Sequence, residues 1–211
     1  IIHKYTGLDN PTFEEFYKHT GKDLRVFVTN LTQGKLIQNS VNNTPHIRVA
    51  EAIQASSAIP FVFKPRTNHK GEHLVDGGLI KNYPLQCFDF YDGHGTRYAN
   101  PATLGFVCKD NSRKLKNGTN TKIPPASNAQ EYIKRVMDTA IAREASTLTP
   151  DDKSRTVMID CPDSVNLLTF KANAQQKEDL EKVAGQAIDS YIDTYYSDHK
   201  PGYGHKPLLY S

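Results

Sequence analysis

The sequence predicts an α/β fold in which helices are layered on a sheet. Short apolar segments with strand character alternate along the chain with longer segments in which apolar residues recur at helical spacing. The segment at residues 24–28 is apolar except for Arg25, as is typical of a strand in a sheet that is covered on both faces. The 211 residues are enough to bury a sizeable core. We expect residues 1–195 to form one domain and residues 196–211, which lack periodicity, to form an extended tail.

The N-terminal part of the chain predicts a helix at residues 12–18 and then a hairpin. Apolar side chains recur on one face of that helix, and Gly21 provides a natural C-terminal stop. After the strand at residues 24–28, a turn at residues 33–34 leads into a second strand at residues 35–38. We expect this second strand to lie at the edge of the sheet.

A second helix is predicted to begin near Thr44 and to end before Pro60. The side chain of Thr44 can cap a helix, and Pro45 has a φ angle suited to a first turn. The last turn, at residues 55–58, consists only of alanine and serine. Because these side chains are small, the backbone of that turn can lie close to the element on which it packs.

A short apolar strand then ends in Asp76-Gly77-Gly78. An acid at the end of a strand, followed by paired glycines, places a carboxylate at the rim of a sheet, on a turn that permits positive φ and the close approach of another group. The same three residues are also compatible with an ordinary Asp-Gly turn. The choice between these interpretations depends on the surrounding sequence.

The second half of the chain predicts two further strands and two helices. The strands lie at residues 102–108 and 155–159, and the helices begin near Ser127 and at the cap Asn173. The last helix carries a continuous apolar stripe that we expect to pack on the sheet. The polar segment at residues 109–125 predicts a surface loop whose positive charges are a candidate lipid-facing cluster, although solvent exposure alone would also explain them.

The composition argues against several classes of function. A net charge of +3 without a basic, aromatic-interleaved strip does not favour nucleic-acid binding. No apolar run is long enough to cross a bilayer, so any membrane contact is expected to be peripheral. The three cysteines have no paired spacing, so we expect reduced, buried thiols and neither a disulfide framework nor a zinc site. The compartment stays open between the cytoplasm and a secreted destination.

Two blocks in the middle of the chain resemble the second signature block of the patatin-like phospholipases. Residues 55–60 read Ala-Ser-Ser-Ala-Ile-Pro, and residues 75–84 read Val-Asp-Gly-Gly-Leu-Ile-Lys-Asn-Tyr-Pro. The resemblance is to bacterial members and covers residues 12–195. It implies a helix/sheet/helix sandwich with a largely parallel central sheet. Further similar segments lie at residues 20–26, 29–31, 100–106 and 155–160.

The resemblance implies a lipid acyl hydrolase of the phospholipase A type, which cleaves fatty acyl esters of phospholipids with a Ser-Asp dyad and without a metal or other cofactor. Asp76 falls on the aspartate of that dyad, and Gly77 and Gly78 form its supporting turn. The family's nucleophile lies upstream in a Gly-x-Ser-x-Gly elbow, a pattern that these residues lack. We therefore expect residues 1–195 to be the C-terminal part of a patatin-like catalytic domain, inert alone, with the nucleophile on a missing N-terminal or separate segment.

Two alternatives stay open, namely a non-catalytic binding module with the same fold and one piece of a two-chain enzyme. His69, His73 and His94 lie near the aspartate in sequence and could in principle complete a triad, but His69 and His94 lie in predicted turns. Ser56 and Ser57 lack the flanking glycines of a nucleophile elbow. We expect these two serines to pack the end of a helix.

Overall fold

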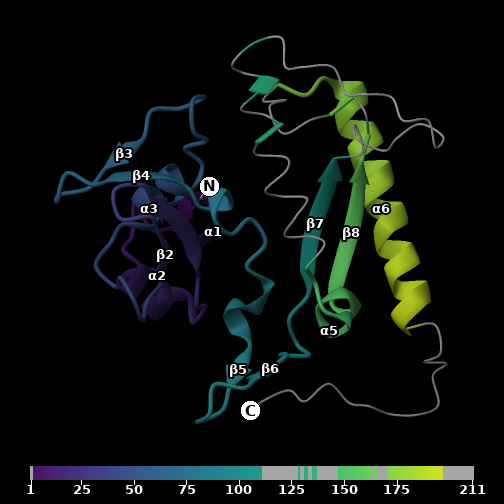
Figure 1. Ribbon diagram of the computed structural model, residues 1–211, viewed down its shortest axis with the longest axis horizontal. Helices are drawn as coiled ribbons and strands as arrows, with labels where there is room; N and C mark the ends of the chain where they lie inside the picture. Colours follow the sequence, from purple (N-terminus) through teal and green to yellow (C-terminus); the bar gives the residue numbers. More distant parts are fainter. Residues whose placement is uncertain are drawn as a thin grey trace. The chain divides into compact units, whose positions relative to one another are not determined.

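The secondary structure of the protein is mixed α/β, which confirms the predicted fold class (Figure 1). The computed structural model describes residues 2–110, 128, 131–132, 135–136, 147–162, 164–165 and 171–196. These residues belong to two compact units, one of Ile1–Pro84 with Pro124–Thr147 and the other of Leu85–Ile123 with Leu148–Ser211. The boundary expected between residues 195 and 196 stays a prediction, because residues 197–211 lie outside the described part of the chain.

The first unit begins with α1 (Ile2–Thr6) and α2 (Phe13–Thr20). Thr12 caps α2 through a capping box, since its hydroxyl accepts the backbone N–H of Glu15 while the Glu15 carboxylate accepts the backbone N–H of Thr12. Gly21 ends the helix in the left-handed conformation. The predicted helix and its stop are confirmed, and Phe13 on its apolar face is buried in the core of this unit.

The next helix, α3 (Val49–Ser56), ends before Pro60 as predicted but begins later than predicted. Thr44 does not cap it, because the Thr44 hydroxyl accepts the backbone N–H of Ser40 and donates to the side chain of Asn39. The chain from Thr44 to Arg48 therefore closes a turn before the helix starts. Val49 donates its backbone N–H to Pro11, which fixes the start of α3 next to α2.

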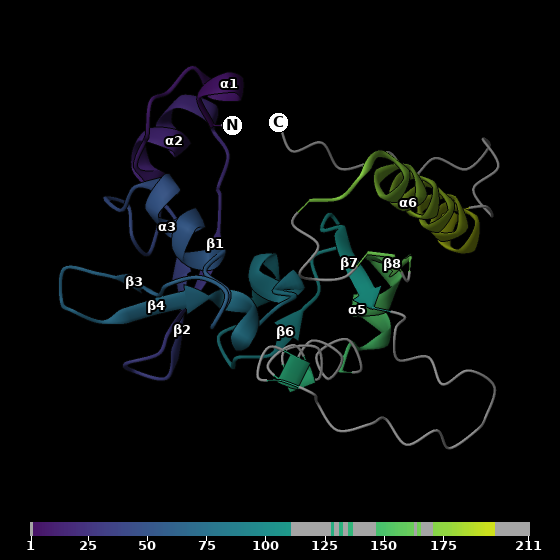
Figure 2. The same ribbon diagram turned by 90° about the horizontal axis from the view of Figure 1, so that it is seen from above.

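The first unit contains a four-stranded sheet with the order β2-β1-β4-β3, and all of its pairings are antiparallel, unlike the largely parallel central sheet that the resemblance implies. Tight turns join β1 to β2 and β3 to β4, which makes those neighbours antiparallel. The predicted hairpin and the edge position of its second strand are confirmed. Figure 2 shows α3 beside β1 and β4. The strands are β1 (Val26–Asn30), β2 (Lys35–Asn39), β3 (Arg66–Thr67) and β4 (His73–Asp76).

The second unit contains the parallel pair formed by β7 (Gly105–Asp110) and β8 (Thr156–Cys161). Lys109 and Asp110 were predicted to begin a loop, but they continue β7 because they pair with residues of β8. Residues 111–125 and most of the helix predicted from Ser127 lie outside the described residues. The smaller elements of this unit are η2 (Leu85–Phe88), β5 (Phe90–Tyr91), β6 (Arg97–Tyr98) and α5 (Pro150–Ser154).

The last helix, α6 (Ala174–Tyr196), lies beside β8 (Figure 1). Asn173 caps it as predicted, because its side chain accepts the backbone N–H of Gln176 at 2.9 Å. Tyr191 is buried and packs with Val157 and Ile159 of β8, so the predicted packing of this helix on the sheet is confirmed. Its residues Val183, Ala184 and Ala187 also pack there.

The cysteines are less buried than predicted. Cys108 is exposed because β7 alternates its side chains and Val107 takes the buried position, while Cys87 and Cys161 are partly buried. None of the helices in the described residues is long and apolar enough to span a bilayer.

Candidate functional site

Asp76 is the last residue of β4 and lies opposite Val28 of β1. Its backbone N–H donates to the carbonyl of Ala58, just beyond α3, at 3.1 Å. Ala55 and Ala58 are buried, so the small-residue end of α3 lies directly against the end of β4. The close approach predicted for residues 55–58 is therefore confirmed, and it holds the aspartate in place through the main chain.

The chain continues from Asp76 into the 3-10 turn η1 (Gly77–Leu79). The Asp76 carboxylate caps this turn, because Oδ1 accepts the backbone N–H of Gly78 at 2.7 Å. Neither Gly77 nor Gly78 has a positive φ. The turn that the sequence pattern predicts permits a positive φ, but neither glycine adopts one, so the backbone conformation does not require glycine at these positions.

Space is restricted at both glycines, and only at Gly77 does the backbone of another strand cause the restriction. A Cβ atom on Gly77 would lie 2.3 Å from the backbone oxygen of Phe27 in β1. A Cβ atom on Gly78 would lie 2.8 Å from Oδ1 of Asn82 and 3.1 Å from Oδ1 of Asp76. Gly77 thus lets the turn pack on the sheet, and Gly78 keeps room beside the carboxylate.

The side chain of Asp76 is half-buried, and its pKa is raised above the ordinary value of 3.8. Burial is the main cause, and the hydrogen bond from the Gly78 backbone offsets part of it. Within the described residues, no lysine, arginine or histidine side chain forms an ion pair with Asp76. A carboxylate with a raised pKa is a stronger base than a solvated one.

The structure places the other candidate residues away from this carboxylate or in structural roles. His69 and His73 are exposed, and among the described contacts neither side chain reaches Asp76. His94 belongs to the second unit, where it is exposed in the turn between β5 and β6. Ser56 is the last residue of α3, and the Ser57 hydroxyl donates to the carbonyl of Gln54 at the helix end.

A cavity of about 780 Å³ lies in the same unit, but Asp76 does not line it. Val28 and Leu74 form part of its wall, and Leu74 points to the same face of β4 as Asp76 because side chains alternate along a strand. Glu72 on its polar side accepts hydrogen bonds from Asn68 and Asn30, at 2.8 and 3.0 Å, which lower its pKa. The described residues contain no group of three or more His, Cys, Asp or Glu side chains arranged to hold a metal ion.

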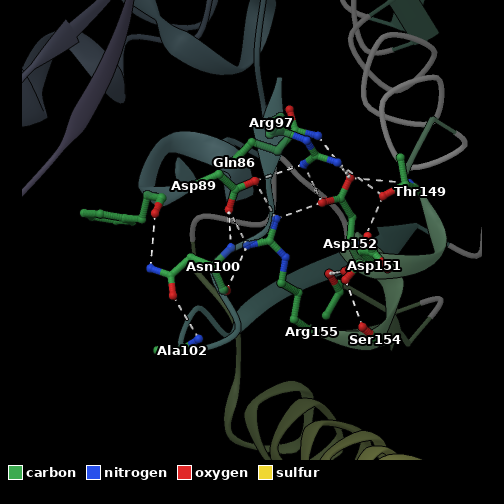
Figure 3. Close-up of polar contacts among 12 residues, drawn as sticks. Gln86, Asp89, Arg97, Asn100, Ala102, Thr149, Asp151, Asp152, Ser154 and Arg155 are labelled. Atoms are coloured by element: carbon green, nitrogen blue, oxygen red, sulfur yellow. Dashed lines mark hydrogen bonds and ion pairs between the residues drawn. The ribbon is translucent and has the colours of Figure 1, made fainter. Parts of the chain in front are cut away.

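The second unit holds a polar cluster that the sequence did not predict, formed by Asp89, Arg97, Asp152 and Arg155 (Figure 3). We call it the Asp-Arg cluster. Arg155 donates to Asp89 at 2.5 and 2.7 Å and to Asp152 at 2.9 Å. Arg97 also donates to both carboxylates at 2.9 Å.

Each charge of the Asp-Arg cluster is compensated by its neighbours. Burial alone would raise the pKa of Asp152, but hydrogen bonds from Arg97, Arg155 and Gln86 outweigh it and hold that pKa well below its ordinary value. The pKa of Asp89 is lowered in the same way. The hydrogen bonds that Arg155 makes to Asp89 and Asp152 raise the pKa of Arg155. We interpret the cluster as a structural connection between η2, β6 and α5, since both carboxylates accept hydrogen bonds from both arginines.

Comparison with known proteins gives a family match over part of the chain and two viral relatives. Residues 5–89 match the family model described as patatin-like phospholipase, and this range includes Asp76, Gly77 and Gly78. The chain is 31% identical over 74 residues to a protein of Invertebrate iridescent virus 6 named probable lipid hydrolase 463L. It is 24% identical over 193 residues to the uncharacterized protein R571 of Acanthamoeba polyphaga mimivirus. The resemblance to patatin-like phospholipases is therefore confirmed.

These matches cover the chain unevenly. The two viral matches cover 35% and 91% of this chain but only 25% and 60% of the relatives' own lengths. Among solved structures, VipD from Legionella pneumophila aligns with a TM-score of 0.49 and 20% identity, over 87% of this chain and 35% of that one.

Proposed function

We propose that this chain supplies the aspartate base of a serine-dependent lipid acyl hydrolase of the patatin-like kind. The observation that carries this proposal is the setting of Asp76. It lies within the matched residues 5–89, at the end of a strand, and its half-buried carboxylate accepts one backbone hydrogen bond among the described contacts. Gly77 and Gly78 support it by allowing the turn to pack closely.

The second carboxylate oxygen is the one available for chemistry. Oδ1 is used by the Gly78 backbone, whereas Oδ2 accepts no hydrogen bond from a described residue. In the proposed reaction, Oδ2 takes the proton from a serine hydroxyl as the serine oxygen attacks the acyl ester carbonyl. The proton then passes to the alcohol oxygen as the ester bond breaks, and the acyl group stays on the serine as an acyl-enzyme. A water molecule activated by the same carboxylate then hydrolyses the acyl-enzyme, which releases the fatty acid and restores the serine.

The nucleophile and the oxyanion donors must come from outside these residues in this proposal, because no Gly-x-Ser-x-Gly pattern occurs in them. The segment or second chain that carries them is therefore a required partner. The substrate class we propose is the acyl ester of a phospholipid at a membrane surface. The description of the matched family and the name of the viral lipid hydrolase support this class.

The test is Asp76→Asn in the full-length protein, with fatty acid release from phospholipid vesicles as the readout. The amide keeps the shape of the side chain and can still accept the Gly78 N–H, but it cannot take the serine proton. We expect a loss of about 10²–10⁴-fold in activity without loss of fold. The matched control is Asp92→Asn, at a carboxylate that caps the exposed turn between β5 and β6, which should stay within a few-fold of wild type. Activity of Asp76→Asn near that of the control would overturn the proposal.

A non-catalytic binding module is the second candidate, favoured by the absence of the elbow pattern from these residues. A fluorophosphonate probe separates the two candidates, since it labels an activated serine covalently. The full-length protein should be labelled if it is a serine hydrolase, and labelling should fall in Asp76→Asn. An unlabelled full-length protein that still binds phospholipid would favour the binding module.

A further inference from the structure

Residues 59–65, which lie between α3 and β3, form a loop with three consecutive exposed apolar side chains. We call it the Phe61 loop. The exposed fractions of Phe61, Val62 and Phe63 are 82%, 40% and 47%. Single exposed apolar side chains are common on soluble domains, whereas a contiguous exposed group of them marks a surface used in binding.

The conformation of the loop keeps Phe61 away from the protein. The carbonyl of Ile59 accepts the backbone N–H groups of Val62 and Phe63, at 3.2 and 3.0 Å, which closes a turn around Phe61. The φ of Phe61 is +68°, in the left-handed region that bulky side chains avoid. Here the strained backbone holds an aromatic ring in solvent, and burial of the ring does not offset the strain. Strained conformations of this kind are typical of functional segments.

The charged side chains at the end of this loop have one sign. Residues 59–66 contain Lys64 and Arg66 but no acid, whereas Lys70 further along the chain lies beside Glu72. Lys64 and Arg66 are exposed, and they follow the apolar tip directly. Apolar side chains next to basic ones are complementary to an anionic lipid surface, where the former enter the acyl boundary and the latter meet the headgroup phosphates.

We propose that the Phe61 loop docks the protein on an anionic lipid surface. Phe61 and Val62 would enter the interface, and Lys64 would contact headgroups. The choice of a lipid partner rests on the proposed function, and the loop is placed to serve it: Ala58, one residue before the loop, accepts the backbone N–H of Asp76. Docking through this loop therefore brings the lipid surface next to the candidate catalytic carboxylate.

The test measures binding of the full-length protein to sedimented vesicles of phosphatidylcholine with and without phosphatidylserine. Phe61→Asn suits this test, because asparagine tolerates a positive φ and the variant should fold at least as well as wild type. We expect its partition onto the anionic vesicles to fall about tenfold or more, as loss of one inserted aromatic side chain implies. Lys64→Gln should weaken binding about fivefold, and only to vesicles that contain phosphatidylserine.

The matched control is Tyr5→Asn, at an aromatic side chain in the same unit that is 77% exposed but lies in α1. It should bind vesicles like wild type. Two outcomes would overturn the docking proposal. In the first, wild type fails to bind the anionic vesicles, which is the result expected of a loop that binds a protein partner. In the second, Phe61→Asn binds the vesicles as well as Tyr5→Asn does.

A second readout separates this inference from the proposed function. A short-chain, water-soluble acyl ester below its critical micelle concentration needs the active site but no docking surface. Phe61→Asn should hydrolyse that ester at the wild-type rate while it loses vesicle binding. If wild type hydrolyses no ester but Phe61→Asn still loses vesicle binding, the proposed function fails and the docking loop stands.

A fluorescence measurement locates the loop directly. None of the 211 residues is tryptophan, so Phe61→Trp adds a reporter at the tip of the Phe61 loop. Its difference spectrum against wild type should shift to shorter wavelength when anionic vesicles are added, whereas that of Tyr5→Trp should not. Equal shifts for both variants would contradict docking through this loop.

Discussion

Asp76 is the last residue of β4 in the first unit, and Asp152 lies in α5 just before β8 in the second, and their surroundings differ. The Asp152 side chain is 0% exposed and accepts hydrogen bonds from Arg97, Arg155 and Gln86. The Asp76 side chain is half-buried and, among the described contacts, accepts only the Gly78 backbone N–H. The pKa of Asp152 is lowered, whereas the pKa of Asp76 is raised.

This difference shows that burial alone does not decide the role of a carboxylate. Burial raises the pKa of both groups, and the number of cationic donors determines the net direction. A carboxylate matched by two arginines stabilises the fold and is not available as a base. A carboxylate left without a cation keeps its capacity to accept a proton from a substrate or nucleophile.

The largest effect that tests this comparison is expected for Asp152→Ala. Removing one acid leaves Arg97 and Arg155 with a single carboxylate, Asp89, in a buried setting. Breaking a buried ion pair costs about 3–5 kcal/mol, so the free energy of unfolding of the second unit should fall by that amount in chemical denaturation. Asp151→Ala changes the neighbouring, exposed acid of α5 and should cost far less. Equal costs for the two variants would show that the Asp-Arg cluster does not stabilise the fold.

A smaller loss of stability is expected in the first unit from Gly77→Ala. The new methyl group would collide with the Phe27 backbone, which cannot move without disturbing β1. Such overpacking costs about 1–3 kcal/mol. Gly93→Ala is the matched control, because a Cβ atom there meets nothing within 4 Å and its φ is not positive. A thermal unfolding midpoint of Gly77→Ala equal to that of Gly93→Ala would argue against the tight packing of η1 on β1.

The two aspartates should also affect the pH dependence of stability in opposite directions. The folded-state pKa of Asp76 lies above its ordinary value of 3.8, so its contribution to stability decreases as pH rises from 3.8 through the raised pKa. The folded-state pKa of Asp152 lies below 3.8, so its contribution is present above 3.8 and is lost as pH falls below it.

Unfolding free energies measured between pH 3 and pH 7 provide the test. Relative to wild type, Asp76→Asn should gain stability as pH rises, because the amide removes the cost of the buried charge. Asp152→Asn should show its largest deficit at neutral pH and a smaller one in acid. Parallel curves for the two variants would contradict the assignment of opposite pKa shifts.

Local features of the sequence predicted much of the fold. The capping residues Thr12 and Asn173 and the stop at Gly21 act within one helical turn, so their effects could be deduced from neighbouring residues. The predicted start of α3 was wrong. The Thr44 hydroxyl bonds to Asn39 and Ser40 in a turn, and the local sequence around Thr44 does not show that this turn forms in place of a helix cap. The exposure of Cys108 was not predicted. Phe106 and Val107 are both apolar and lie on opposite faces of β7, so the sequence does not show which face is buried.

The candidate site was predictable only as far as the pattern around Asp76 extends. The Asp-Gly-Gly triplet indicated a strand-end carboxylate with close packing, but it did not show that Phe27 is the group that Gly77 must accommodate. The Asp-Arg cluster joins residues 66 positions apart, Asp89 and Arg155, and depends entirely on tertiary structure. The strain at Phe61 was equally hidden, because its φ is set by a turn closed on Ile59.

The smallest effects are expected at the histidines, which test whether Asp76 acts without an intermediary. A histidine that relayed the serine proton would have to hydrogen-bond to the carboxylate, yet His69 and His73 are exposed and within the described contacts neither side chain reaches Asp76. We therefore expect His69→Ala and His73→Ala, in the full-length protein, to keep ester hydrolysis within a few-fold of wild type, and His94→Ala to do the same. The pH profile should likewise show no group titrating near the ordinary histidine pKa of about 6.5. If any one of these substitutions removed activity as fully as Asp76→Asn, that histidine would be the base, and Asp76 would orient it instead of accepting the proton directly.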